Sequence, residues 1–211
     1  MATEVREKHL HILQKAEDLF AKKGFEATTV RDIAKAAGIN LAMISYYFGS
    51  KDRLLEQLFR YRMSVITEEL SRLTHTKTLS PLEKLQIFIE EYINRVFRKQ
   101  SFYKIIFSEQ IINNNPKVIK LMQELKMNNF RLIEMIIKDG QNQKLFKEEV
   151  DILFLLNTVT GTVIQNVISK EYYKQLHGYK KMPGSEFDDL FKQNLRIYLN
   201  NLLKAILMYE K

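Results

Sequence analysis

The sequence predicts an all-α protein in which a three-helix head is followed by a larger helical domain. Apolar residues recur at the three- and four-residue spacing of amphipathic helices along most of the chain. The 211 residues include only three prolines and seven glycines, so the helices can be long and rarely interrupted. No stretch has a convincing strand pattern, and the 45% of hydrophobic residues suffices for a sizeable core.

The first two helices of the head are bounded by residues with clear capping roles. We expect the first helix over residues 3–23, with Gly24 ending it. Thr29 can cap the second helix, and Asp32, three residues later, is its partner in a capping box. Gly38 ends the second helix, because glycine adopts a positive φ without a steric clash. With the helix that follows, this spacing predicts a helix-turn-helix.

The third helix has an outer face that is unusual for a solvated helix. Asn40 is a good N-cap, and Ile44 and Phe48, four residues apart, form the inner face. The side chains on or beside the opposite face are uncharged, and several are small or aromatic: Ala42, Met43, Ser45, Tyr46 and Tyr47. Such a face suits insertion into the major groove of DNA, where base edges and thymine methyl groups are read.

Six further helices are expected, over residues 51–73, 81–99, 102–112, 116–138, 148–173 and 185–209. Ser80 caps one of them, and Ser185 with Asp188 predicts another capping box. The last two helices are apolar over most of their circumference, so they must be covered on more than one side. A thick internal core and a four-helix interface between two copies both provide that cover, and the periodicity leaves both open.

Composition and charge limit the compartment and the partners. The chain has no cysteine, which excludes disulfides and thiolate metal sites and is compatible with a reducing cytoplasm. The net charge is +8, but residues 1–60 hold ten basic and eight acidic residues, so bulk charge at most assists steering towards DNA. The charged start and the lack of a long apolar run predict a cytoplasmic protein without membrane contact. We place the head at residues 1–50 and the second domain at residues 51–211.

Patterns typical of catalytic and metal sites are missing from the sequence. His9 and His11 are two apart on a helix and point to different faces, while His75 and His177 lie in polar loops. Neither a Gly-rich phosphate loop nor a Gly-x-Ser-x-Gly motif occurs. We therefore expect that the protein is not an enzyme and that it binds neither a metal nor a cofactor.

One ordered set of short matches runs through the head and into the next helix: Thr28-Thr29, Ile33-Ala34, Ala37-Gly38-Ile39, Tyr47-Phe48, Ser50-Lys51 and Leu54-Leu55. This set resembles the DNA-binding motif of the TetR/AcrR family of bacterial transcriptional regulators. The chain departs from the family pattern at Asn40, Ala42 and Met43, where the family usually has a small cap, Gly or Pro, and Thr. It also has Ser45 where the family usually has a tyrosine that contacts phosphate.

The resemblance implies a set of DNA contacts at the matching positions. Those expected to face base edges are Leu41, Ala42, Met43 and Tyr46, with Arg31 reaching a base or a phosphate. Those expected to hold phosphates are Thr29, Ser45, Tyr47 and Lys51, which would set the register on the duplex. The helical wheel leaves Leu41 open, because it lies near the inner face. For Tyr46 and Tyr47, packing against neighbouring helices is the alternative.

The third helix lacks the residues that dominate direct readout of bases. After its cap it contains no Lys, Arg, Asn or Gln, so it cannot make bidentate contacts with guanine or adenine. We expect recognition through thymine methyl groups and Arg31, with a contribution from DNA shape.

The resemblance further implies a ligand-responsive repressor that binds a palindromic operator in double-stranded DNA as a homodimer formed through the last two helices. Candidate residues for a pocket that takes a hydrophobic small-molecule effector are Phe88, Tyr92, Phe107, Phe130, Asn157 and Gln165. Ordinary core packing explains the aromatic residues equally well. The alternative function is a helical nucleoid-associated or adaptor protein without a small-molecule effector.

Overall fold

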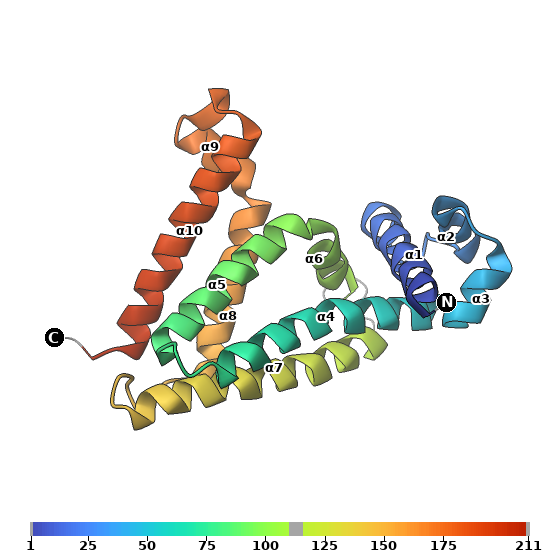
Figure 1. Ribbon diagram of the computed structural model, residues 1–211. Coiled ribbons are helices and arrows are strands. Elements are labelled where there is room, and N and C mark those ends of the chain that lie inside the picture. The colour runs from blue at the N-terminus through green and yellow to red at the C-terminus, as the bar shows by residue number, and fades with distance from the viewer. Residues whose placement is uncertain (1, 110–115, 210–211) are drawn as a thin grey trace. The chain divides into compact units, whose positions relative to one another are not determined.

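The computed structural model describes residues 2–109 and 116–209, and its architecture is all-α (Figure 1). Over these residues no strand is present, so the predicted fold class is confirmed. The chain divides into two compact units: Met1–Thr67 with Lys99–Met127, and Glu68–Arg98 with Asn128–Lys211. The domain boundary predicted at residue 50 stays a prediction.

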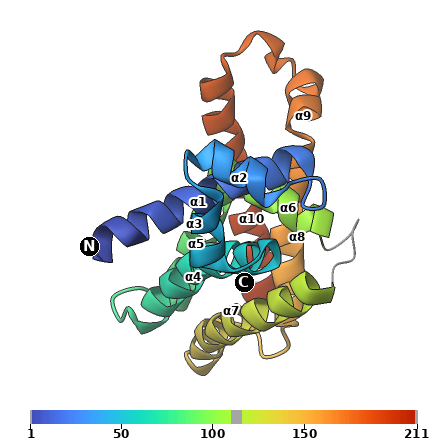
Figure 2. The same ribbon diagram turned by 90° about the vertical axis from the view of Figure 1, so that its right-hand side faces the viewer.

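The first unit is built around α1. Its helices are α1 (Ala2–Lys23), α2 (Val30–Ala37), α3 (Leu41–Phe48), the first part of α4 (Lys51–His75), α6 (Gln100–Phe107) and the start of α7 (Pro116–Asn142). Helix α1 packs against both α2 and α6, and α2 packs against α3 (Figures 1 and 2). The buried residues of the head lie at helical spacing and form one core: Ile12, Leu13, Ala16, Phe20, Ile33, Ile44 and Phe48.

A buried ion pair joins α1 to α4 within this unit. Arg62 donates from Nε to Oε2 of Glu17 over 2.7 Å, and from Nη2 to Oε1 of Gln14 over 3.0 Å. The Glu17 side chain is almost fully buried, so loss of Arg62 would leave an uncompensated buried charge.

The second unit is built around α5 (Pro81–Arg98). This helix packs against α8 (Ile152–Ile168) and α10 (Gly184–Leu207). Between them the chain forms α9 (Lys170–Leu176) and the short 3₁₀ helix η2 (Tyr179–Lys181). An aromatic cluster ties α5, α9 and α10 together: Phe97, Tyr173, Phe187 and Phe191.

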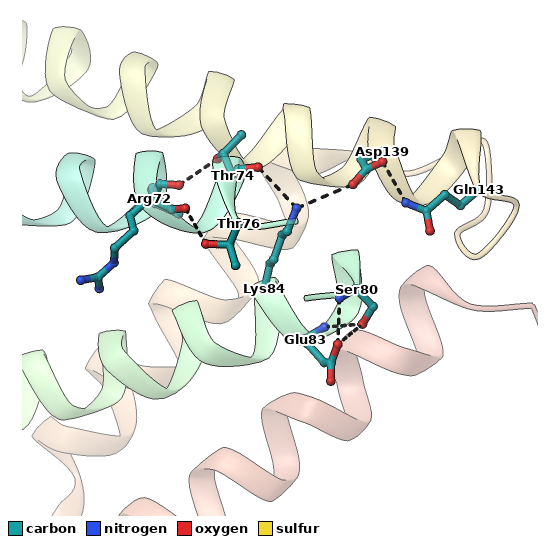
Figure 3. Close-up of polar contacts among 9 residues, drawn as sticks. Arg72, Thr74, Thr76, Ser80, Glu83, Lys84, Asp139 and Gln143 are labelled. Atoms are coloured by element: carbon teal, nitrogen blue, oxygen red, sulfur yellow. Dashed lines mark hydrogen bonds and ion pairs between the residues drawn. The ribbon is translucent and has the colours of Figure 1, made fainter. Parts of the chain in front are cut away.

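Lys84 fixes the C-terminal end of α4 inside the second unit (Figure 3). Only 5% of this lysine is exposed, and its Nζ donates to the carbonyl oxygen of Thr74 over 3.4 Å. The same Nζ lies 3.8 Å from Oδ2 of Asp139 on α7. Lys84 therefore links α4, α5 and α7, and the positive charge also suits the negative end of the α4 dipole. The predicted cap of α5 is confirmed, since Ser80 and Glu83 bond reciprocally.

The helix predicted over residues 148–173 is wrong at both ends. Asp151 caps α8 by accepting from the backbone N–H of Phe154 over 2.9 Å, so the helix begins only at Ile152. Ser169 ends it, because its hydroxyl bonds the carbonyl of Gln165 over 2.7 Å and its backbone leaves the helical region. The chain then turns by 69° into α9.

Two further boundary predictions need correction. Helix α7 continues to Asn142, past the predicted end at 138, because the chain accommodates Gly140 within the helix. The predicted capping box of Ser185 is wrong: Pro183 takes the N-cap position of α10 without a side-chain bond. Asp188 instead accepts from Nζ of Lys170 over 2.8 Å.

Smaller differences concern the ends of α4 and α6. Helix α4 extends to His75, and α6 starts at Gln100 rather than at 102; its α-helical part ends at Phe107, and residues 108–109 continue it in π-helical form. The predicted helix end at 110–112 and the loop at 113–115 lie outside the described residues. No single helix of the described chain is long and apolar enough to cross a membrane, although the bent pair α8 and α9 meets the length and composition criteria together.

Candidate nucleic-acid interface

The predicted capping box at the start of α2 is confirmed. Oγ1 of Thr29 accepts from the backbone N–H of Asp32 over 3.1 Å, and Oδ2 of Asp32 accepts from the N–H of Thr29 over 3.0 Å. The backbone and side-chain hydrogen bonds from Thr29 lower the pKa of Asp32, and Lys23, 3.6 Å away, lowers it further. At the other end, Gly38 has φ 65° and donates to the last carbonyls of α2.

Helix α3 is fixed by its cap and by its inner face. Oδ1 of Asn40 accepts from the backbone N–H of Ala42 over 3.0 Å, as the sequence predicts. Ile44 and Phe48 are buried in the head core, and Gly49 ends the helix with φ 75°. Because both ends and one face are held, the opposite face is presented in a defined orientation.

The outer face of α3 is formed by uncharged side chains. Tyr46 is 83% exposed, and Ala42 and Ser45 are also exposed. Leu41, which the helical wheel left open, is 37% exposed and lies at the edge of this face. Met43 is half-buried. Ala42 and Tyr46 thus lie on the accessible side of α3, whereas Met43 is partly covered and Leu41 is exposed on the first turn of the helix.

Tyr47 and Lys51 have partners inside the head. The Tyr47 ring is half-buried and meets the ring of His9 edge-on at 6.2 Å between centroids. Nζ of Lys51 donates to the carbonyl of Phe25 over 2.9 Å and lies 4.3 Å from the centroid of that ring. Both side chains therefore help to hold the head together, and their predicted phosphate contacts stay predictions.

The cationic residues near α3 lie on the helices next to it. Arg31 is exposed on the first turn of α2, and Lys35 is exposed one turn later. Arg53 is exposed on the first turn of α4 and approaches Gly49 at the end of α3. Lys35 and Arg53 were not among the contacts predicted from the sequence. The available signal was the four-residue spacing of Lys35 from Arg31, which places both on one face of α2, and the position of Arg53 in the first turn of α4.

The six candidate effector residues do not form one group. Phe88 and Tyr92 are buried on α5 with stacked rings at 6.4 Å, and Phe130 is half-buried on α7. Asn157 and Gln165 are exposed on α8. Phe107 is exposed and belongs to the first unit, whereas the other five belong to the second. The prediction that these residues line a pocket stays untested.

A buried charged pair in the second unit has unused hydrogen-bonding capacity. Glu69 on α4 and Arg95 on α5 form a largely buried ion pair. Burial raises the pKa of Glu69 by more than Arg95 lowers it. Within the described part of the chain, Oε1 of Glu69 and Nη1 of Arg95 have no hydrogen-bond partner. A polar group of a bound molecule or a water molecule would satisfy both atoms.

A groove of about 590 Å³ runs between α8 and α10. Its lining mixes amide, hydroxyl and aromatic side chains: Thr162, Gln165, Asn166, Asn194, Phe191 and Tyr198. Large apolar side chains on the same two helices are exposed: Leu153, Phe154, Ile168, Ile197 and Tyr198. Helix α8 was expected to be covered on more than one side, but in the single chain this face is open.

Comparisons with known proteins match most of the chain to two family models. Residues 12–58 match the family described as "Bacterial regulatory proteins, tetR family". Residues 59–180, more than half of the chain, match the family described as "YsiA-like protein, C-terminal region".

Individual relatives extend this similarity. The probable HTH-type transcriptional regulator YttP of Bacillus subtilis is 30% identical over 138 residues, covering 63% of this chain and 64% of that protein, which is less than two thirds of its length. The fatty acid metabolism regulator protein of Bacillus subtilis is 23% identical over 162 residues, covering 77% and 82%. The crystal structure of FadR from Bacillus subtilis in complex with stearoyl-CoA has a TM-score of 0.68 at 20% identity, covering 90% and 96%. The structural likeness shows the same fold.

Proposed function

The chain belongs to the TetR family of bacterial regulatory proteins, and from this premise we propose that it is a cytoplasmic, DNA-binding transcriptional repressor that responds to a small-molecule effector. The observation that supports DNA binding best is the exposed, uncharged face of α3, held in place by caps and a buried inner face. A helix presented in this way fits the major groove as the second helix of a helix-turn-helix does.

Recognition of the operator is proposed to depend on shape and apolar contact. Ala42 and Tyr46 would meet thymine methyl groups, while Arg31 would contact a base or a phosphate. Lys35 and Arg53, exposed beside α3, are suited to the phosphates that set register.

We propose that two copies associate through α8 and α10. Their exposed apolar side chains support this, as does Gly161 in the middle of α8. A helix-interior glycine costs about 1 kcal/mol relative to alanine, and no atom of the described residues lies within 4 Å of the place where its Cβ would be. The close approach of a second chain gives this glycine a role. An interface between identical faces would present two heads to a palindromic operator.

The proposed effector has an apolar body and at least one polar group. The Phe88–Tyr92 pair and the unsatisfied atoms of Glu69 and Arg95 support that combination. FadR, which shares the fold, was crystallised with stearoyl-CoA. An effector would release the operator only if it binds more tightly to a conformation in which the two heads do not match the half-sites.

Selection of bound sequences from random duplexes tests the DNA-binding proposal. We expect a palindromic site with thymine-containing half-sites. Tyr46→Ala should then weaken binding of the selected duplex by about 1–3 kcal/mol. Glu56→Gln, an exposed substitution on α4, is the control and should leave affinity unchanged. Enrichment of no sequence, even at low salt, would overturn the proposal.

The alternative of a nucleoid-associated or adaptor protein differs in its response to small molecules. Thermal melting against a panel of acyl-CoA thioesters and other apolar compounds distinguishes the two. A specific rise in Tm together with release of the selected duplex supports the ligand-responsive repressor.

A further inference from the structure

We infer that His9 on α1 is a positioning residue for the DNA-contacting face of α3, an inference that rests on the proposed DNA-binding function. The proposed base contacts do not include His9, and its position on α1 gives no hint of this role in the sequence. Its side chain nevertheless touches two other helices of the head, α3 and α4.

A hydrogen bond fixes the orientation of the His9 ring. Nε2 of His9 lies 2.7 Å from Oε1 of Gln57 on α4. An amide oxygen only accepts, so Nε2 carries the hydrogen and donates it. The bond spans 48 positions in the sequence and is partly buried, so it ties α1 to α4 rather than stabilising one helix locally.

The ring held in this way packs on the last turn of α3. It stacks on Phe48 with centroids 4.6 Å apart and planes at 28°. Phe48 is buried, so it cannot move away from the ring. The His9 ring also contacts the Tyr47 ring edge-on, with the two centroids 6.2 Å apart. His9 therefore restricts where the ring of Tyr47 can lie.

Tyr47 in turn contacts the exposed residue next to it. The rings of Tyr46 and Tyr47 are T-shaped at 5.2 Å between centroids, an arrangement that favours one relative orientation. Tyr46 is otherwise 83% exposed. The chain of contacts Gln57–His9–Tyr47–Tyr46 thus links the interior of the head to the side chain proposed to meet the bases.

This positioning matters because α3 lacks residues that read bases bidentately. An unrestrained Tyr46 would have to lose rotamer freedom on binding DNA, and that loss opposes binding. A Tyr46 that is already oriented avoids part of this cost, so the effect of His9 should appear as operator affinity that depends on Tyr46.

The test uses three single variants of the full chain and a double-mutant cycle. His9→Gln keeps a donor for Gln57 but removes the ring, His9→Phe keeps the ring but removes the donor, and His11→Ala changes an exposed histidine of the same helix. We expect His9→Gln to weaken binding of the selected duplex about three- to tenfold. His9→Phe should recover much of this loss, and His11→Ala should have no effect.

In the Tyr46→Ala background, His9→Gln should change affinity less than twofold, because the side chain that it positions is gone. A merely structural role of His9 would weaken binding equally in both backgrounds, and that result would overturn the inference. NMR of the protein with ¹³C-labelled tyrosines, recorded without DNA, tests the positioning role of His9 independently of the proposed DNA-binding function. Unchanged Tyr46 and Tyr47 signals in His9→Gln overturn the positioning role, whereas a wild-type chain that prefers no duplex overturns DNA recognition itself.

Discussion

Gly140 is a residue whose missing side chain is a packing requirement. A Cβ added there would lie 2.2 Å from Cδ2 of Phe146, whose ring is fully buried. We expect Gly140→Ala to lower the free energy of unfolding by about 1–3 kcal/mol, because overpacking outweighs the better helix propensity of alanine. Urea denaturation followed by circular dichroism measures the change. Gly184→Ala is the control, because nothing lies within 4 Å of its added Cβ, and equal losses in both variants would contradict the packing argument.

For individual residues, some side-chain positions could be predicted from the sequence and others could not. Asn40 and Tyr46 were placed correctly, because a cap and an outer face depend on residues within one or two turns. The contact that Lys51 makes inside the head could not be predicted, since the carbonyl that it binds belongs to Phe25, 26 positions upstream. The burial of Lys84 likewise depends on α4 and α7, which periodicity within α5 does not reveal.

At the scale of the element, the cap of α2 makes the stability of the head depend on pH. The folded-state pKa of Asp32 is lowered below the usual 3.8 by its hydrogen bonds to Thr29. A carboxylate of this kind stabilises the fold above its unfolded pKa, and the contribution is lost as pH falls through the lower folded value. Asp32→Asn should therefore be less stable than wild type at pH 7, and the gap should begin to narrow as the pH falls below 3.8.

Urea denaturation of both proteins at pH 7 and pH 3 measures that gap. Glu26→Gln, an exposed acidic residue of the head outside the capping box, is the control. A stability difference between wild type and Asp32→Asn that stays the same at both pH values would show that the charged cap contributes nothing.

Helix ends divide into those set by neighbouring residues and those set by distant ones. The Thr29–Asp32 and Ser80–Glu83 boxes were predictable because both partners lie within one turn. The box at Ser185 was not formed because α10 begins at Gly184, which places Ser185 inside the helix, and Asp188 binds Lys170, 18 positions upstream. The break at Ser169 was missed because neither Gly nor Pro stands there, and the hydroxyl bond to Gln165 that marks it is not evident from the sequence.

At the scale of the whole molecule, the all-α class and the family followed from periodicity and from one motif, whereas the effector site did not. A high density of aromatic residues on α5 to α8 is expected both of a hydrophobic core and of a ligand pocket. The sequence alone therefore could not show that Phe88 is buried and Phe107 is exposed. Conversely, the sequence marked the last two helices as needing cover on more than one side, and it left open whether an internal core or a second copy supplies that cover. What the structure adds is the identity of the open face, which includes Phe154 and Gly161.

The proposed association of two copies can be tested on that face without touching the head. Phe154 is 73% exposed on α8, so Phe154→Glu should leave the fold intact but place a charge in the proposed apolar interface, where an unpaired charge is costly. We expect sedimentation equilibrium to show twice the 25.0 kDa chain mass for wild type and mainly the single mass for the variant. Met135→Glu, at an equally large exposed residue of α7, should remain paired.

Phe154→Glu should also bind the palindromic duplex more weakly than wild type. Its affinity for a single half-site should stay the same, because each head is unchanged. If Phe154→Glu stays paired while Met135→Glu separates, the interface lies on another face than α8 and α10.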